Sequence, residues 1–173
     1  MRNIFVFTLI LFFNANVFAK NEKHIFKPEI GTFTLEFPGN PACKSVVIDQ
    51  LKPPIGMIVC TFANVKDQLF YSVVYYDNHT KNESISEYEN LRNALTGMLT
   101  KSQSELIYES EITINGRTAL ESLSKEKNDL VLVSRFLFID KSLVLIQIGG
   151  WRGRLMPEDV SAFLDSLRIT SKK

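Results

Sequence analysis

The chain has 173 residues, 45% of them hydrophobic, with 20 basic and 19 acidic side chains. A formal net charge of +1 argues against nucleic-acid binding, which normally needs a strongly basic surface, and against membrane attachment by bulk charge. The length fits one domain that buries most of its surface around a core.

Residues 1–19 have the pattern of a secretory signal peptide. Arg2 gives a basic start, residues 4–13 form an uncharged apolar run, and small or modest side chains at 17–19 fit a cleavage site. The apolar run is about half of the roughly 20 residues that span a membrane, so a retained anchor is not expected. No cysteine stands at the cleavage site, so lipid attachment there is not expected either.

Cleavage after Ala19 leaves 154 residues, 20–173, as a single domain without a marked linker or repeat. Arg2 is the one charge removed, so the remaining chain has 19 basic and 19 acidic residues. We therefore expect a neutral domain in the periplasm or outside the cell.

Cys43 and Cys60 both lie in the exported part, where two cysteines more often pair than stay free. They fall opposite one another if the chain folds back around Leu51-Lys52, and closing such a loop contributes about 3 kcal/mol. The alternative is a metal site that uses these thiols with His24 or His79, although no close ligand pair supports it.

The first half of the domain is rich in strand signals. Polar and apolar residues alternate over 32–37, and the segments 43–48, 57–62 and 69–76 follow as strands. The last of these is apolar on both faces, so both of its faces should be covered. A helix is predicted from Ser84 to about Lys101, with Ser84 and Glu87 as its capping box.

Strands resume at 105–114 and 117–124, joined by Asn115-Gly116, the strongest short hairpin signal. Further strands are predicted at 130–139 and 143–148, and Gly149-Gly150 should end the series. Pro157 then suits the first position of a closing helix. Hairpins and two amphipathic helices together predict an α+β fold, a three-layer α/β/α sandwich around a mostly antiparallel sheet.

The order of these motifs resembles that of PsbP-like domains over about residues 25–169. The motifs are Phe33-Thr34-Leu35-Glu36-Phe37-Pro38-Gly39-Asn40-Pro41, Tyr71-Ser72-Val73-Val74-Tyr75-Tyr76-Asp77, Ile114-Asn115-Gly116-Arg117, Ser134-Arg135-Phe136-Leu137-Phe138 and Phe163-Leu164-Asp165-Ser166-Leu167.

The resemblance implies an α/β/α sandwich and a role in binding another protein rather than in catalysis. The family includes extrinsic photosystem II subunits, a Ran-binding protein, adaptor chaperones for secreted effectors and many bacterial envelope proteins. It shares no set of active-site residues that could be carried over. The export signal disfavours the cytosolic roles among these.

The segment 149–154 is the main candidate site, because it holds Trp151, Arg152 and Arg154 between a strand and a helix. In the functional interpretation Trp151 gives apolar contact and the two arginines pair with a carboxylate or phosphate of a ligand or partner. In the alternative, Trp151 folds back on the core and the arginines are solvated.

Other polar residues have simpler interpretations. Arg135 lies among apolar residues in mid-strand and needs a carboxylate, for which Glu121 is the candidate. Tyrosines could line a groove or belong to the core and its rim. These are Tyr71, Tyr75, Tyr76 and Tyr88. Asn78 and Asn82 begin glycosylation patterns that matter only in a host that glycosylates exported proteins.

No nucleophile motif, paired carboxylates or metal-ligand spacing appears in the sequence. We expect no cofactor, no metal, no nucleic acid and no stable membrane anchor, and the oligomeric state is left open. The leading hypothesis is an exported, non-enzymatic protein-binding or accessory domain whose partner is another envelope protein. The alternatives are a small-molecule or lipid carrier with a cleft between helix and sheet, and a hydrolase built from dispersed residues.

Overall fold

The computed structural model describes residues 23–28, 32–48, 54–76 and 81–170. Its elements are β1 (His24–Phe26), β2 (Phe33–Phe37), β3 (Ala42–Ile48), β4 (Ile55–Asn64), β5 (Leu69–Tyr76), α1 (Glu87–Ser102), β6 (Glu105–Ile114), β7 (Arg117–Lys125), β8 (Leu130–Ile139), β9 (Ser142–Trp151), α2 (Pro157–Leu164) and β10 (Arg168–Ile169). The predicted signal peptide, the turn at Leu51-Lys52, His79 and Asn78 lie outside the described residues.

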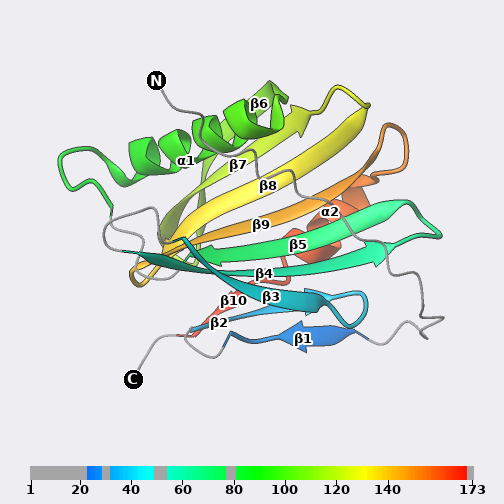
Figure 1. Cartoon of the computed structure of the whole chain (residues 1–173), viewed down its shortest axis with the longest axis horizontal. Coiled ribbons are helices and arrows are strands. Elements are labelled where there is room, and N and C mark those ends of the chain that lie inside the picture. Colours follow the sequence, from blue (N-terminus) through cyan, green and yellow to red (C-terminus); the bar gives the residue numbers. More distant parts are fainter. Residues whose placement is uncertain (1–22, 29–31, 49–53, 77–80, 171–173) are drawn as a thin grey trace.

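Seven strands form one large sheet in the order β3-β4-β5-β9-β8-β7-β6, and β1, β2 and β10 form a small sheet (Figure 1). Every strand pair within the described ranges is antiparallel. The predicted α+β class and antiparallel sheet are confirmed. The strands β1 and β10 were not predicted, because three and two residues are too few to show a period.

The two faces of the large sheet are covered differently. Helix α1 covers one face, where Leu91 and Leu95 are fully buried against the sheet. The other face is covered by α2 together with β2, which buries Phe33, Leu35 and Phe37. Because α2 has only eight residues, the expected second helical layer is shared between a helix and a small sheet.

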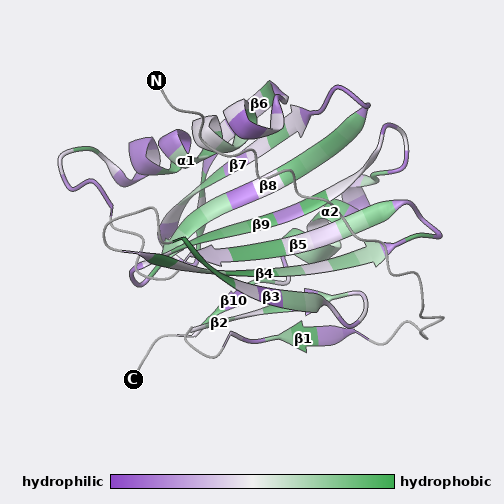
Figure 2. Cartoon of the chain, viewed as in Figure 1, coloured by the Kyte–Doolittle hydropathy of each residue, from purple (hydrophilic) through white to green (hydrophobic). Residues whose placement is uncertain are grey.

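Hydrophobic residues follow the central strands β5, β8 and β9 over most of their length, with a polar stretch in mid-β8 (Figure 2). Along β5 the side chains alternate as predicted: Tyr71 and Val73 enter the core under α2, and Val74 packs against the α1 cluster. Phe163 of α2 anchors the first core, with its ring centroid 5.1 Å from that of Tyr71. Both faces of β5 are therefore covered, as its sequence predicts.

The core beneath α1 also contains hydroxyl groups. Ser134 accepts a hydrogen bond from Gln147, with 3.0 Å between Oγ and Nε2. The hydroxyls of Ser122 and Ser124 are buried and have no hydrogen-bond partner among the described residues. A buried hydroxyl without a partner loses its hydration and gains nothing in return, so these serines weaken the packing under α1.

Helix α1 starts two residues later than predicted. The capping box consists of Ser86 and Glu89, not Ser84 and Glu87: the Glu89 amide donates to Ser86 Oγ over 3.1 Å, and the Ser86 amide donates to Glu89 Oε2 over 2.9 Å. The Ser84 amide instead donates to the side chain of Asn82, which holds Ser84 in the preceding turn. The hydrogen bond from the Ser86 backbone holds the pKa of Glu89 below its usual value.

Strand β9 is longer than predicted and does not end at its glycines. A Cβ on Gly149 would lie 2.2 Å from the ring of Phe70, its direct partner on β5. A Cβ on Gly150 would lie 2.6 Å from Leu69. The two glycines therefore make room for side chains of the neighbouring strand, and the ladder continues to Trp151.

The predicted disulfide is confirmed. Cys43 on β3 stands directly opposite Cys60 on β4, and their sulfur atoms are bonded. Both thiols are consumed, so the metal site that was considered for them is wrong. The predicted hairpin turn is also confirmed, with positive φ at Asn115 (50°) and Gly116 (75°).

No helix within the described ranges is long and apolar enough to cross a membrane.

Candidate functional site

The segment 149–154, the main candidate site from the sequence, is part strand and part turn. Gly149, Gly150 and Trp151 belong to β9, and the chain then turns, with the Arg154 amide donating to the Trp151 carbonyl over 2.8 Å. Gly153 has a φ of +81°, a conformation that favours glycine in such a turn.

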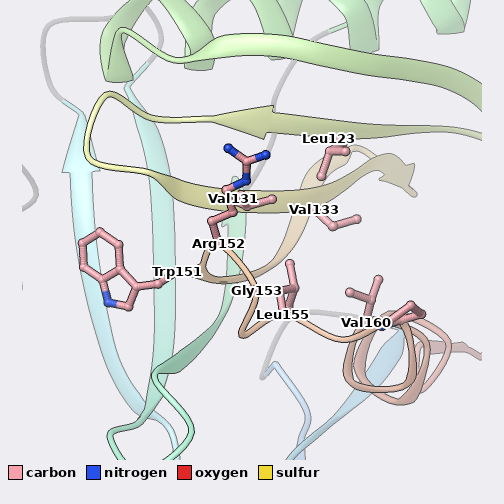
Figure 3. Close-up of a pocket in the computed structure, with 9 residues that line it drawn as sticks. Leu123, Val131, Val133, Trp151, Arg152, Gly153, Leu155 and Val160 are labelled. Carbon is pink, nitrogen blue, oxygen red and sulfur yellow. The ribbon is translucent and has the colours of Figure 1, made fainter.

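Two of the three predicted site residues, Trp151 and Arg152, line one hollow beside the turn, and Arg154 is not among its lining residues. Trp151 is 43% exposed, and its indole projects away from Leu155 and Val160 (Figure 3). Arg152 and Arg154 are exposed and form no ion pair within the described part of the chain. The predicted turn with solvated arginines is therefore correct, but Trp151 does not fold back into the core.

Backbone contacts fix this turn against the β7–β8 connection. The Arg152 amide donates to the Asp129 carbonyl over 3.1 Å. Lys125, which pairs with Asp129 at 2.6 Å, holds the pKa of that carboxyl below its usual value, and Arg152 adds a smaller contribution. These contacts hold the turn against the β7–β8 connection.

Beside the turn lies a hollow of about 200 Å³ on the α2 side of the sheet (Figure 3). We call it the apolar hollow. Its walls come from β7, β8, the turn 151–153 and the start of α2. The apolar side chains around it are Leu123, Val131, Val133, Leu155, Pro157 and Val160. It is open because the short helix α2 does not extend over this end of the sheet.

The apolar hollow continues onto the edge strand β6. Tyr108 stands directly opposite Leu123 and is 51% exposed. Ile107 and Leu106 precede it and are 53% and 37% exposed, at a point where the register of the ladder shifts. Leu106 is opposite Ser124 and lies on the α1 face, so we call Ile107 and Tyr108 together with the apolar hollow the β6–hollow surface.

A second, more polar depression of about 460 Å³ lies beside the other end of α2. At its base Arg135 Nε is 2.8 Å from Glu121 and its Nη1 is 2.6 Å from Asp165. The predicted Arg135–Glu121 pair is confirmed, and Asp165 was not foreseen because it comes from another element. Both carboxylates already engage a 15% exposed guanidinium, which makes this network structural.

The tyrosines do not form a common groove. Tyr71 and Tyr75 are buried on the α2 side, and burial raises the pKa of Tyr71 to about 12. Tyr76 and Tyr88 pack against the α1 cluster on the opposite face. The interpretation of these residues as core and rim is therefore the correct one.

No family model matches this chain, and no curated protein matches it either. The solution structure of cyanobacterial PsbP (CyanoP) from Synechocystis sp. PCC 6803 superposes with a TM-score of 0.58 and 10% identity, over 90% of this chain and 96% of that one. The chain has a PsbP-like fold. A crystal structure of PA94 from Pseudomonas aeruginosa, a protein of unknown function described as a putative regulator, matches with a TM-score of 0.43 and 11% identity, over 80% of this chain and 90% of that one.

Of the predicted site residues, Trp151 and Arg152 line the apolar hollow of this PsbP-like domain, but the sequence did not single out its apolar walls or the exposed residues of β6. Leu123 and Val133 have the pattern of ordinary core positions, because their partial exposure depends on where α2 begins. A signal was available at Leu106-Ile107-Tyr108, three large apolar residues between glutamates at 105 and 109. Successive side chains on a strand point to opposite faces, so three consecutive apolar residues are all buried only where both faces of the strand are covered.

Proposed function

We propose that this PsbP-like domain is an exported, non-enzymatic binding or accessory protein that docks another envelope protein on its β6–hollow surface. The observation that carries the proposal is the continuity of that surface, from exposed Tyr108 through Leu123 to the apolar hollow. Contiguous exposed apolar surface rimmed by polar residues is typical of protein-interaction sites.

Export is supported by two independent features. The first is the signal-peptide pattern of residues 1–19. The second is the Cys43–Cys60 disulfide, a bond that persists in oxidising compartments. The partner must then also be outside the cytoplasm.

The size of the apolar hollow favours protein docking over a carrier role. Sites for small molecules usually enclose about 300–1,000 Å³, whereas this hollow has about 200 Å³. The polar depression is larger, but its base is occupied by the Arg135 ion pairs. A protein side chain that inserts from outside fits a small, open, apolar hollow.

The test is affinity capture from the protein's own envelope fraction with the wild type and two variants. Tyr108→Asp places a charge on the β6–hollow surface, and Asn93→Asp places one on the exposed side of α1 as a matched control. We expect a partner that the wild type and Asn93→Asp retain and Tyr108→Asp loses. Equal capture by all three, or native mass spectra that show a bound lipid and no protein, would overturn the proposal.

A further inference from the structure

We propose that β6 accepts an extended segment of the partner as an eighth strand, and that this segment alternates basic and apolar residues. The inference rests on the proposed function and names the partner's chemistry. Four features of β6 carry it: its position in the sheet, the direction of its backbone groups, its two faces and its charge.

The backbone of β6 has a free side. Strand β6 is the last in the sheet order, and no described strand pairs with its outer edge. In a two-residue hairpin the residues flanking the turn, here Ile114 and Arg117, exchange both hydrogen bonds, and pairs with and without hydrogen bonds alternate from there. The N–H and C=O groups of Thr113, Glu111 and Glu109 therefore point outward, where an added strand would meet them.

The two faces of β6 differ in chemistry. Glu111 is opposite Leu120 of the α1 cluster, and Glu109 is 2.8 Å from Arg92 of α1, so both glutamates lie on the α1 face. The opposite face presents Tyr108 and Ile112, the latter packed against the core under α2. An added strand would place its side chains alternately on these faces. Because Glu109 is already paired with Arg92, a basic residue fits the α1 face beside Glu111, and apolar residues fit the face that continues into the apolar hollow.

The charge of β6 selects against a second copy of this chain. Antiparallel pairing of two β6 strands about Ser110 would place Glu109 of one copy opposite Glu111 of the other. Registers centred on Glu109 or on Glu111 would place identical glutamates opposite each other. Like charges directly opposite in a ladder are destabilising, whereas opposite charges stabilise it. A register about Ile112 instead pairs Glu111 with Thr113 and carries no such repulsion. Like charge therefore disfavours two copies in the registers about Glu109, Ser110 and Glu111, whereas a basic strand from a different protein meets these glutamates with opposite charge.

The register shift between Leu106 and Tyr108 limits where a strand can add. Bulges and charges on edge strands commonly prevent unwanted pairing. Here the shift leaves the ladder regular from Tyr108 to Ile114. The regular stretch is long enough for a short strand, and Tyr108 stands at its end as an aromatic anchor. If the shift and the charges only prevent pairing, no strand adds to β6, and that outcome would overturn the inference.

The probe is an end-blocked heptapeptide in which lysine alternates with valine, titrated into the 15N-labelled domain. We expect the peptide to protect the amide hydrogens of Glu109, Glu111 and Thr113 from exchange. Glu111→Lys should weaken binding about fivefold, since one attractive cross-strand pair becomes repulsive. Glu83→Lys, the same charge change before α1, should leave binding unchanged.

Two further probes separate backbone pairing from charge. A peptide with glutamate in place of lysine should not bind, and a lysine peptide N-methylated on alternate residues should lose the amide protection. Glu111→Ala, which keeps the backbone amide, should bind more weakly than the wild type and more tightly than Glu111→Lys. Unprotected amides at saturation, or equal binding of the lysine and glutamate peptides, would refute strand addition.

The envelope capture distinguishes this inference from the function on which it rests. If Tyr108→Asp loses the partner but Glu111→Lys and Glu111→Pro both retain it, a protein docks on the β6–hollow surface without adding a strand, and only the present inference fails. If Tyr108→Asp retains the partner as well, the proposed function itself is wrong.

Discussion

Opening the Cys43–Cys60 bond is the perturbation whose cost can be worked out most directly. The bond closes a loop with a sequence separation of 17 residues. The chain-entropy relation for a loop of this length gives about 3 kcal/mol at 25 °C, because the cross-link restricts the unfolded chain. For a domain of this size that corresponds to a fall in Tm of roughly 10 °C.

The assay is equilibrium urea unfolding, followed by circular dichroism, of the oxidised protein and of the same protein in reductant. Reduction isolates the cross-link, whereas Cys43→Ala with Cys60→Ala also deletes the fully buried Cys60 sulfur and should cost somewhat more. We expect the reduced wild type to unfold at lower urea. Coincident transitions for the oxidised and reduced protein would show that the cross-link does not stabilise the fold and would refute the reasoning.

Three further substitutions test the packing. Gly149→Ala should destabilise the domain by about 1–3 kcal/mol, because a Cβ there would lie 2.2 Å from the Phe70 ring; an unchanged urea midpoint would contradict the close approach. Ser124→Ala should leave stability unchanged or raise it by up to about 1 kcal/mol, since its buried hydroxyl has no partner among the described residues; a loss of more than that would reveal an unrecognised hydrogen bond. Arg135→Ala should cost about 2 kcal/mol, because it leaves Glu121 partly buried without its cation; Arg135→Lys should recover part of the loss in thermal denaturation, and equal melting of both variants would argue against the ion pair.

The sequence predicts most of the large sheet because each of its strands carries local signals. Asn115-Gly116 sets the β6–β7 hairpin turn by backbone conformation alone, and the next hairpin, β7–β8, brings Glu121 opposite Arg135. Cys43 and Cys60 are likewise joined through neighbouring strands. These features need only short-range information, which periodicity and turn residues supply.

The rest depends on contacts between elements that are distant in the chain. The glycines at the end of β9 read as a stop, and only the Phe70 and Leu69 side chains on β5 explain why the strand continues. The capping of α1 is an exception, because the contact that decides it is local: the side chain of Asn82, two residues away, holds Ser84 in a turn.

The candidate site shows the same limit. The sequence predicted a site at Trp151, Arg152 and Arg154 from residue type, and the structure places Trp151 and Arg152 in the lining of the apolar hollow, without Arg154. The β6–hollow surface arises because α2 is too short to cover β7 and β8 beside its first residues. No local pattern in the strands indicates where a helix in another layer begins.

Site-specific photo-crosslinking in the intact envelope tests whether a protein docks on the β6–hollow surface. A photoreactive residue in place of Tyr108 probes the β6–hollow surface, and one in place of Lys44, exposed on the opposite edge strand β3, serves as the control. If a protein docks there, we expect a discrete protein adduct at position 108 that is absent at position 44. No adduct at position 108, or the same adducts at both positions, would contradict a docking role for this surface.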